Sequence, residues 1–251
     1  MTDKNPIQVS DRIFRVIETL ANCGPSGLIE LSKKLDLNKS TVHRILNALI
    51  CMGYVKQDLA TSKYFLSFKI CEIASQVQEK ISVIDIARPF LKQLVRDTGE
   101  TVHLVQMDGT SAIYIDKVES DLNTVRLVSR IGKRIPLYCS GVGKSIMAGL
   151  PDLQIKELWE QSEIQSLTPH TIVDLELFMD EINKIRRNGF AVDNEENELG
   201  VRCVAVSLKD YGGNCYAFSI SAPSNRLDNE KVRLFAAGLL KAKENILSNV
   251  L

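Results

Sequence analysis

The segment 137–150, LYCSGVGKSIMAGL, carries residue types that bind phosphate groups in nucleotide-hydrolysing enzymes. Gly143, Lys144 and Ser145 match the end of the motif G-x-x-x-x-G-K-[ST], whose backbone wraps the phosphates. The first glycine is missing, because Tyr138 stands five residues before Gly143. No acidic strand end that would hold Mg²⁺ accompanies the segment. The sequence therefore argues against an ATPase or GTPase, whereas backbone N–H groups at the start of a helix suit a small anion such as a carboxylate.

Residues that could support catalysis or bind a metal are scattered along the chain. His103 lies in a predicted strand without a nucleophile partner, and His170 lies in a predicted loop. The acidic run 193–196 is more typical of a solvated loop than of a metal site, and the strand position of Cys203 predicts a packed thiol. The six cysteines include no C-x-x-C pair. We therefore expect no enzyme, no cofactor and no metal; the competing hypotheses are an enzyme that uses Asp193, Cys203 or His103, and a metal or redox sensor.

Small polar residues in the second half of the chain are instead typical of a ligand pocket. They start a helix, end one strand, or alternate onto one face of another strand. Such groups among apolar residues suit a small oxygenated ligand. The two serines could equally satisfy backbone groups within a sheet core, so the pattern leaves both interpretations open. The candidate pocket residues are Gly141, Val142, Asp193, Cys203, Ser219 and Ser221.

Three amphipathic helices are predicted in the first fifty residues. Apolar residues from Val9 to Leu20 follow helical spacing, and the segment 23–27 ends that helix. A short helix over about 28–35 and a tight connection follow, and Asn38 is a natural N-cap for the third helix. The expected buried stripe of this third helix consists of Val42, Ile45, Leu46, Leu49 and Ile50.

The opposite face of the third helix is polar, which together with the preceding short helix is typical of a helix-turn-helix. Its side chains can donate to phosphates or base edges in a major groove. Two short strands around the segment 58–62 predict a winged hairpin with Lys63 at its tip. The alternative is an ordinary solvated polar face. The candidate DNA-binding residues are Asn38, Lys39, Ser40, Thr41, His43, Arg44, Asn47 and Lys63.

The pattern changes twice further along the chain. Helical spacing from Ile70 to Ile84 predicts a stiff bridge over about 67–82, and Ser82 with Asp85 resembles a capping pair for the next helix. After Gly99 the pattern predicts an α+β domain, with one mostly antiparallel sheet covered by helices. Its predicted strands are 101–107, 110–118, 124–131, 190–193, 202–208 and 215–221, and its predicted helices are about 142–149, 152–160, 174–188 and 228–247.

Composition sets broad limits on these interpretations. The chain has 251 residues, 45% of them hydrophobic and 25% charged, which is ordinary for a soluble globular protein. Its apolar runs are shorter than a membrane span, and its first residues lack a secretory apolar region, so we expect a cytoplasmic protein without membrane contact. Residues 1–75 hold ten basic and seven acidic residues. This modest excess of positive charge permits nucleic-acid binding by the N-terminal part.

Several segments resemble the IclR family of bacterial transcriptional regulators, in the family's order and over nearly the whole chain. They are ELSKKLDLNKSTVHRILNALICMGYV, IGKRIPLYCSGVGKSIMA, GFAVDNEENELGVRCVAVSLKD and FSISAPSNR. Within the family, the segments YIDKVES, SRIGKRIPLY and DNEENELGVRC look closest to the 2-keto-3-deoxygluconate regulators.

The resemblance implies a winged helix-turn-helix over 1–68, a linker helix over 69–82 and a GAF-like effector domain over 83–251. It also implies a repressor that forms dimers or tetramers, binds pseudo-palindromic operator DNA and responds to a small carboxylic acid such as a keto acid or sugar acid. The six candidate pocket residues would contact this effector. Val142 replaces the alanine of members that respond to glyoxylate or pyruvate, which argues against those ligands. Arg126 or Arg130 would either supply positive charge or lie on the surface.

Overall fold

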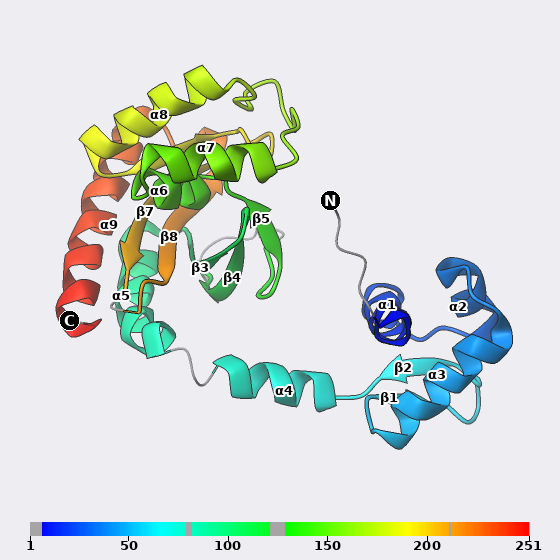
Figure 1. Ribbon diagram of the computed structural model, residues 1–251. Helices are drawn as coiled ribbons and strands as arrows, with labels where there is room; N and C mark the ends of the chain where they lie inside the picture. The colour runs from blue at the N-terminus through cyan, green and yellow to red at the C-terminus, as the bar shows by residue number, and fades with distance from the viewer. Residues whose placement is uncertain (1–6, 79–81, 121–128, 211, 251) are drawn as a thin grey trace. The chain divides into compact units, whose positions relative to one another are not determined.

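The computed structural model describes residues 7–78, 82–120, 129–210 and 212–250, and the chain divides into two compact units (Figure 1). The first unit spans Met1–Lys80 and the second spans Ile81–Leu251. The first unit contains α1 (Gln8–Cys23), α2 (Leu28–Leu35), α3 (Lys39–Cys51), β1 (Val55–Gln57), β2 (Tyr64–Leu66) and α4 (Lys69–Gln78). The predicted helix-turn-helix and hairpin are therefore confirmed.

The three helices and the hairpin of the first unit enclose one apolar core. Its buried members are Val16, Leu20, Leu31, Leu35, Val42, Ile45, Leu46, Leu49, Val55 and Tyr64. One expectation was wrong: Ile50, expected in the buried stripe of the third helix, is 37% exposed. It lies in the last turn of α3, next to the end of the helix at Cys51.

The connection between α2 and α3 is tight because Asp36 adopts a left-handed conformation with φ of 51°. Asn38 occupies the predicted N-cap position of α3, but its side chain makes no capping hydrogen bond. Its main-chain carbonyl accepts the N–H groups of Thr41 and Val42 instead. The side chain of Asn38 therefore stays exposed at the start of α3.

The hairpin differs from the prediction in the position of Lys63. Strands β1 and β2 are antiparallel and pair Val55 with Leu66 and Gln57 with Tyr64. The N–H of Asp58 donates to the carbonyl of Lys63, with the two atoms 2.8 Å apart. Lys63 therefore closes the base of the hairpin loop instead of lying at its tip.

The helical bridge predicted over 67–82 corresponds to α4, and residues 79–81 lie outside the described residues. The next helix, α5 (Ser82–Thr98), opens the second unit. The capping role predicted for the Ser82 side chain also lies outside the described part of the chain.

A six-stranded antiparallel sheet forms the centre of the second unit. Its strands are β3 (Thr101–Asp108), β4 (Ser111–Val118), β5 (Arg134–Pro136), β6 (Ala191–Asn194), β7 (Val201–Lys209) and β8 (Cys215–Pro223), in the order β5-β4-β3-β8-β7-β6. Gly109, at φ of 60°, supports the predicted turn between β3 and β4. The predicted strand 124–131 is not confirmed: residues 124–128 lie outside the described residues and 129–131 are not strand, while the short edge strand β5 was missed.

Helices cover both faces of this sheet, which confirms the α+β prediction (Figure 1). One face packs against α5 and α9 (Asn229–Val250), and the other packs against α6 (Gly141–Ala148), α7 (Asp152–Gln161) and α8 (Leu175–Asn188). Large side chains such as Phe218 and Ile220 face α5 and α9. The opposite face carries Ala205 and Ala217, whose small side chains leave room for α6 to lie close to the strands.

Candidate functional site

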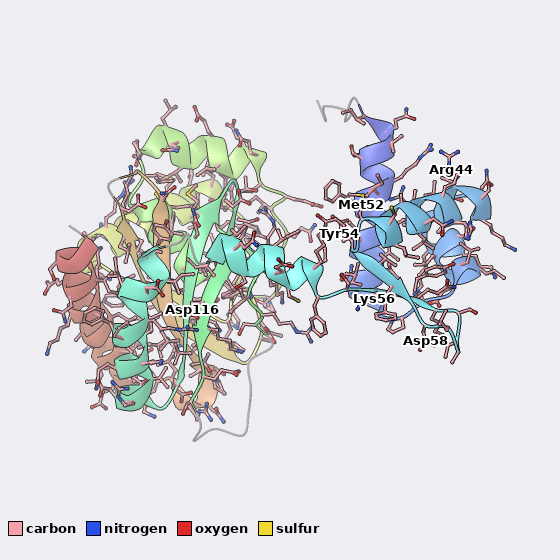
Figure 2. All side chains as sticks on the ribbon, turned by 90° about the horizontal axis from the view of Figure 1, so that it is seen from below. Arg44, Met52, Tyr54, Lys56, Asp58 and Asp116 are labelled. Atoms are coloured by element: carbon pink, nitrogen blue, oxygen red, sulfur yellow. The ribbon has the colours of Figure 1, made fainter. Side chains whose placement is uncertain are left out.

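The polar face of α3 lies on the surface of the first unit. Every predicted DNA-binding residue on or beside this helix is exposed except Thr41, which is half-buried. The amide of Asn47 lies 3.5 Å from Nδ1 of His43, and Figure 2 shows Arg44 pointing outward from α3. These side chains are free of core packing, as groups that contact a nucleic acid must be.

The structure adds basic residues that the sequence reasoning did not select. Arg12 and Lys33 line a shallow hollow together with Asn38 and Thr41. A second groove, between α2 and the hairpin, is lined by residues that include His43 and Lys63. Ordinary surface lysines and arginines carry no sequence signal for such clustering, because it depends on how α1 and α2 pack against α3.

Lys144, the lysine of the phosphate-loop-like segment, is completely buried. Its Nζ lies 2.5 Å from Oε1 of Glu196 and 3.7 Å from Oε1 of Glu181. The helix that carries it is capped by Ser140, whose Oγ accepts the N–H of Gly143. Lys144 therefore pairs with two protein carboxylates, and its complete burial keeps it out of reach of a phosphate group.

The second unit contains a cavity of about 200 Å³ at the strand ends near β5 and β6. Polar and apolar atoms contribute about equally to its surface. The lining residues are His103, Tyr114, Ser129, Lys133, Arg134, Ile135, Pro136, Asp193, Asn197, Glu198, Val201, Cys203 and Ser221. Lys133 and Arg134 are exposed, whereas His103, Asp193 and Ser221 are buried. The exposed side of the cavity therefore carries the basic Lys133 and Arg134 together with the acidic Glu198, and its buried side carries polar groups.

Three of the six predicted pocket residues line this cavity, namely Asp193, Cys203 and Ser221. Gly141, Val142 and Ser219 are buried but are not part of its lining. Gly141 lies close behind Asp193, since a Cβ added at Gly141 would lie 3.3 Å from the Asp193 nitrogen. Ser219 lies on the same face of β8 as Ser221, but it precedes Ser221 in the strand and lies away from the strand end that lines the cavity.

Other lining residues were missed. Arg126 and Arg130 were considered either as a source of charge or as surface residues: Arg126 lies outside the described residues and Arg130 is not part of the lining, whereas Lys133 and Arg134 are. Ser129, Tyr114 and His103 also contribute. Only the strand pairing brings these sequence-distant residues together.

His103 is held by two serines inside the cavity. Its Nδ1 lies 3.2 Å from Oγ of Ser221, and its Nε2 lies 2.7 Å from Oγ of Ser129. Burial, with a smaller contribution from Lys117, lowers the pKa of His103 to about 3. The neutral ring therefore acts as a hydrogen-bonding wall of the cavity.

Asp193 brings a carboxyl group into the cavity. Its Oδ1 accepts the backbone N–H groups of Glu196 and Asn197, at 2.8 and 3.4 Å. Burial, reinforced by the nearby Glu196, raises the pKa of Asp193 to about 7. Asp193 can therefore donate or accept a hydrogen bond near neutral pH.

The loop after β6 is held in place by contacts with two threonines and a lysine. Thr168 Oγ1 donates to the carbonyl of Glu195 at 2.6 Å, and Thr171 Oγ1 donates to that of Glu196 at 2.6 Å. Lys144 holds the Glu196 side chain. This loop presents Asn197 and Glu198 to the cavity, so the anchors determine the shape of the site.

The residues considered for other chemistry are placed unfavourably for it. Burial raises the pKa of the Cys203 thiol, which makes it a poor nucleophile. Within the described ranges, no group of three or more His, Cys, Asp or Glu side chains is arranged to hold a metal ion. Among the same residues, no helix is long and apolar enough to cross a membrane.

A winged helix-turn-helix with an exposed polar recognition helix, joined in one chain to an α+β unit with a polar cavity, is the architecture of a DNA-binding transcriptional regulator. The IclR helix-turn-helix domain family matches residues 10–59, and the family described as bacterial transcriptional regulator IclR C-terminal matches residues 75–248. The chain belongs to the IclR family of bacterial transcriptional regulators. The prediction of a regulator instead of an enzyme is thereby confirmed.

Individual relatives agree with this assignment. The chain is 35% identical to the HTH-type transcriptional regulator KdgR of Escherichia coli over 97% of this chain and 94% of that protein. It is 43% identical to the DNA-binding transcriptional repressor YiaJ of the same species, over 87% and 80% of the two chains. The crystal structure of Thermotoga maritima IclR superimposes with a TM-score of 0.82 at 32% identity, over 96% and 98%.

Proposed function

We propose that this chain is a repressor whose binding to operator DNA is modulated by a small carboxylic acid, such as a keto acid or a sugar acid. The observation that carries the proposal is the polar cavity. At about 200 Å³ it is smaller than the roughly 300–1,000 Å³ typical of pockets for drug-sized ligands. It therefore suits a metabolite of a few carbon atoms.

The two basic side chains and the buried polar groups of the cavity support an acid with additional oxygen atoms as the ligand, with Glu198 also in the lining. The cationic side chains of Lys133 and Arg134 would attract the ligand carboxylate, although Arg134 already pairs with Asp108. His103, Asp193 and Ser221 would hydrogen-bond to hydroxyl or carbonyl oxygens at the buried end. We propose Cys203 as a further wall, and Gly141, Val142 and Ser219 as the layer that supports it.

On the DNA side, α3 would enter the major groove. Ser40, Thr41, His43 and Arg44 would select bases there, while Asn38, Lys39, Asn47 and Lys63 would contact bases or phosphates. The similarity to YiaJ, which is named a repressor, supports a repressor here. Such a protein would act in the cytoplasm, where its operator lies.

Exposed apolar residues support self-association as a dimer or tetramer. On α4, Ile73 and Val77 are 40% and 57% exposed, and on α1 Phe14 is 61% exposed. Pairing two copies would cover such surfaces, and a two-fold dimer would require a pseudo-palindromic operator. The effector would change operator affinity only if its own affinity differs between the arrangements of the dimer that bind and do not bind DNA.

The test uses the full chain, a duplex selected from a randomised library, and 2-keto-3-deoxygluconate, pyruvate and galacturonate as separate probes. One acid should raise the melting temperature by mass action and lower operator affinity in a fluorescence anisotropy titration. His103→Phe should abolish both responses while leaving operator binding without the acid unchanged. If none of the acids alters melting or operator binding at millimolar concentration, the proposed effector class is wrong; if an acid strengthens operator binding, the proposed mode of repression is wrong.

A further inference from the structure

Leu59 is the most exposed large apolar side chain among the described residues, at 96%. It lies in the hairpin loop, residues 58–63, between β1 and β2. Scattered apolar residues are normal on protein surfaces, so exposure alone assigns no role. The structure of the loop around Leu59 supplies further evidence.

The backbone of the hairpin loop is ordered by hydrogen bonds within the loop. Asp58 Oδ1 accepts the N–H groups of Ala60 and Thr61, at 2.8 and 2.9 Å. The Gln57 side chain donates to the carbonyl of Ser62 at 3.2 Å, and Ser62 adopts a left-handed conformation with φ of 56°. These bonds fix the backbone on both sides of Leu59, so the loop that presents this side chain has little backbone entropy left to lose on binding.

The loop belongs to the DNA-binding side of the first unit. Thr61, Ser62 and Lys63 line the same groove as His43, which lies on the polar face of α3. Figure 2 shows Asp58 at the opposite end of the hairpin from Tyr54. Because the major and minor grooves alternate along a duplex, a hairpin beside a helix in the major groove would lie next to the neighbouring minor groove.

The charges of the hairpin favour a polyanionic partner. Lys56 and Lys63 are exposed, whereas the Asp58 carboxylate is directed to N–H groups of its own loop. A protein partner is less suitable, because a lone leucine surrounded by Ala60, Thr61 and Ser62 lacks the ring of apolar neighbours that hot spots need. DNA offers a narrow groove into which apolar side chains are known to insert between base steps.

We propose that Leu59 inserts into the minor groove beside the recognition site and selects sequence there through groove width and deformability. This inference rests on the proposed binding of DNA through α3. A methyl-bearing side chain contributes no charge, so its contribution should be independent of salt and should depend on the ease with which the flanking base steps open. The flanks of the operator, outside the bases contacted by α3, would therefore influence affinity.

The experiment compares the full chain with Leu59→Ala and Leu59→Met on the selected duplex, by anisotropy titration over a range of salt concentrations. Leu59→Ala should weaken binding about ten-fold, as expected for losing most of one buried leucine, with an unchanged salt slope. Leu59→Met should retain affinity. Exchanging the flanking base pairs for stiff A-tracts should weaken the native protein and leave Leu59→Ala nearly unaffected.

Two controls separate this inference from the proposed function. Leu153→Ala removes a leucine of α7 that is 71% exposed, and it should not change binding. Arg44→Ala should weaken binding through α3. If Arg44→Ala weakens binding while Leu59→Ala does not, or if the flanks affect both proteins equally, the role of Leu59 is overturned and DNA binding through α3 stands. If Arg44→Ala has no effect, the α3 assignment itself fails. A change of oligomeric state by Leu59→Ala, measured by sedimentation, would also overturn the inference.

Discussion

The ammonium group of Lys144 lies 2.5 Å from Oε1 of Glu196, and both side chains are buried. This pair joins α6 to the loop that follows β6. Oε2 of Glu196 has no hydrogen-bond partner among the described residues. Lys144 therefore provides most of the compensation for the negative charge of the buried Glu196 carboxylate.

Replacing Lys144 by Met should destabilise the second unit by about 3–5 kcal/mol, because it leaves a buried charge without its partner. Urea unfolding followed by far-ultraviolet circular dichroism would measure this. Lys144→Met combined with Glu196→Gln should recover part of the loss, since the double variant buries no charge. Lys156→Met, on the exposed side of α7, serves as the matched control, and an equal effect of both lysine variants would contradict this role of Lys144.

Gly143 should not tolerate a side chain. A Cβ at this position would overlap the backbone of Leu137, which flexible side chains could not relieve. We expect Gly143→Ala to cost at least about 1–3 kcal/mol, the usual range for overpacking. Gly149→Ala is the comparison, because the nearest atom to its Cβ would be 3.4 Å away. Thermal melting of both variants checks the difference, and equal melting temperatures would disprove the close approach of α6 to Leu137.

The raised pKa of Asp193 predicts a specific dependence of stability on pH. Its pKa is about 7 in the folded protein against 3.8 for the ordinary group. Between these values the folded state binds more protons than the unfolded state, so this contribution to stability is complete at low pH and is lost as pH rises towards 7. The melting temperature of Asp193→Asn relative to the native protein should therefore rise from pH 4 to about 7 and then level off.

His103 acts in the opposite direction, so the two groups can be distinguished. Its pKa falls from 6.5 to about 3 on folding, and the unfolded chain takes up the proton first as the solution is acidified. Stability due to the neutral ring is thus lost as pH falls below about 6.5. His103→Phe should lose less stability than the native protein between pH 6.5 and 5. Parallel curves for the two proteins would show that the ring is not buried as described.

Two basic side chains of the first unit should affect DNA binding in different ways. Arg44→Ala should cost about 1–3 kcal/mol on the selected duplex if the guanidinium makes a bidentate base contact, and much less on random DNA. Lys56→Ala should weaken binding to both duplexes equally and reduce the salt slope by about one. Anisotropy titrations on both duplexes provide the measurement. Equal losses on both duplexes for Arg44→Ala would assign that residue to the phosphates.

The sequence predicted most of the fold because the relevant signals are local. The polar face of α3 follows directly from helical spacing, and the turn at Asp108–Gly109 follows from the preference of glycine for left-handed backbone. The edge strand β5 was not predicted, because its three residues are too few to show an alternation of apolar and polar side chains. Lys63 was placed at the loop tip because its hydrogen bond to Asp58 cannot be inferred from residue types.

Only three of the six predicted pocket residues line the cavity, because its composition depends on how distant strands pair. Asp193, Cys203 and Ser221 stood out as small polar residues at strand ends, whereas His103 looked like an isolated strand histidine. Strand β3 pairs with β8, with His103 opposite Ser219 and Thr101 opposite Ser221. That long-range pairing makes His103 part of the site, and a single sequence contains no direct signal for it.

The central position of β8 in the sheet affects the order in which the two units can be completed during synthesis. All of the first unit precedes residue 81, but β3 cannot acquire its inner neighbour until residues 215–223 leave the ribosome. A growing or prematurely terminated chain would therefore hold the complete helix-turn-helix unit before the strands that line the cavity can pair with one another.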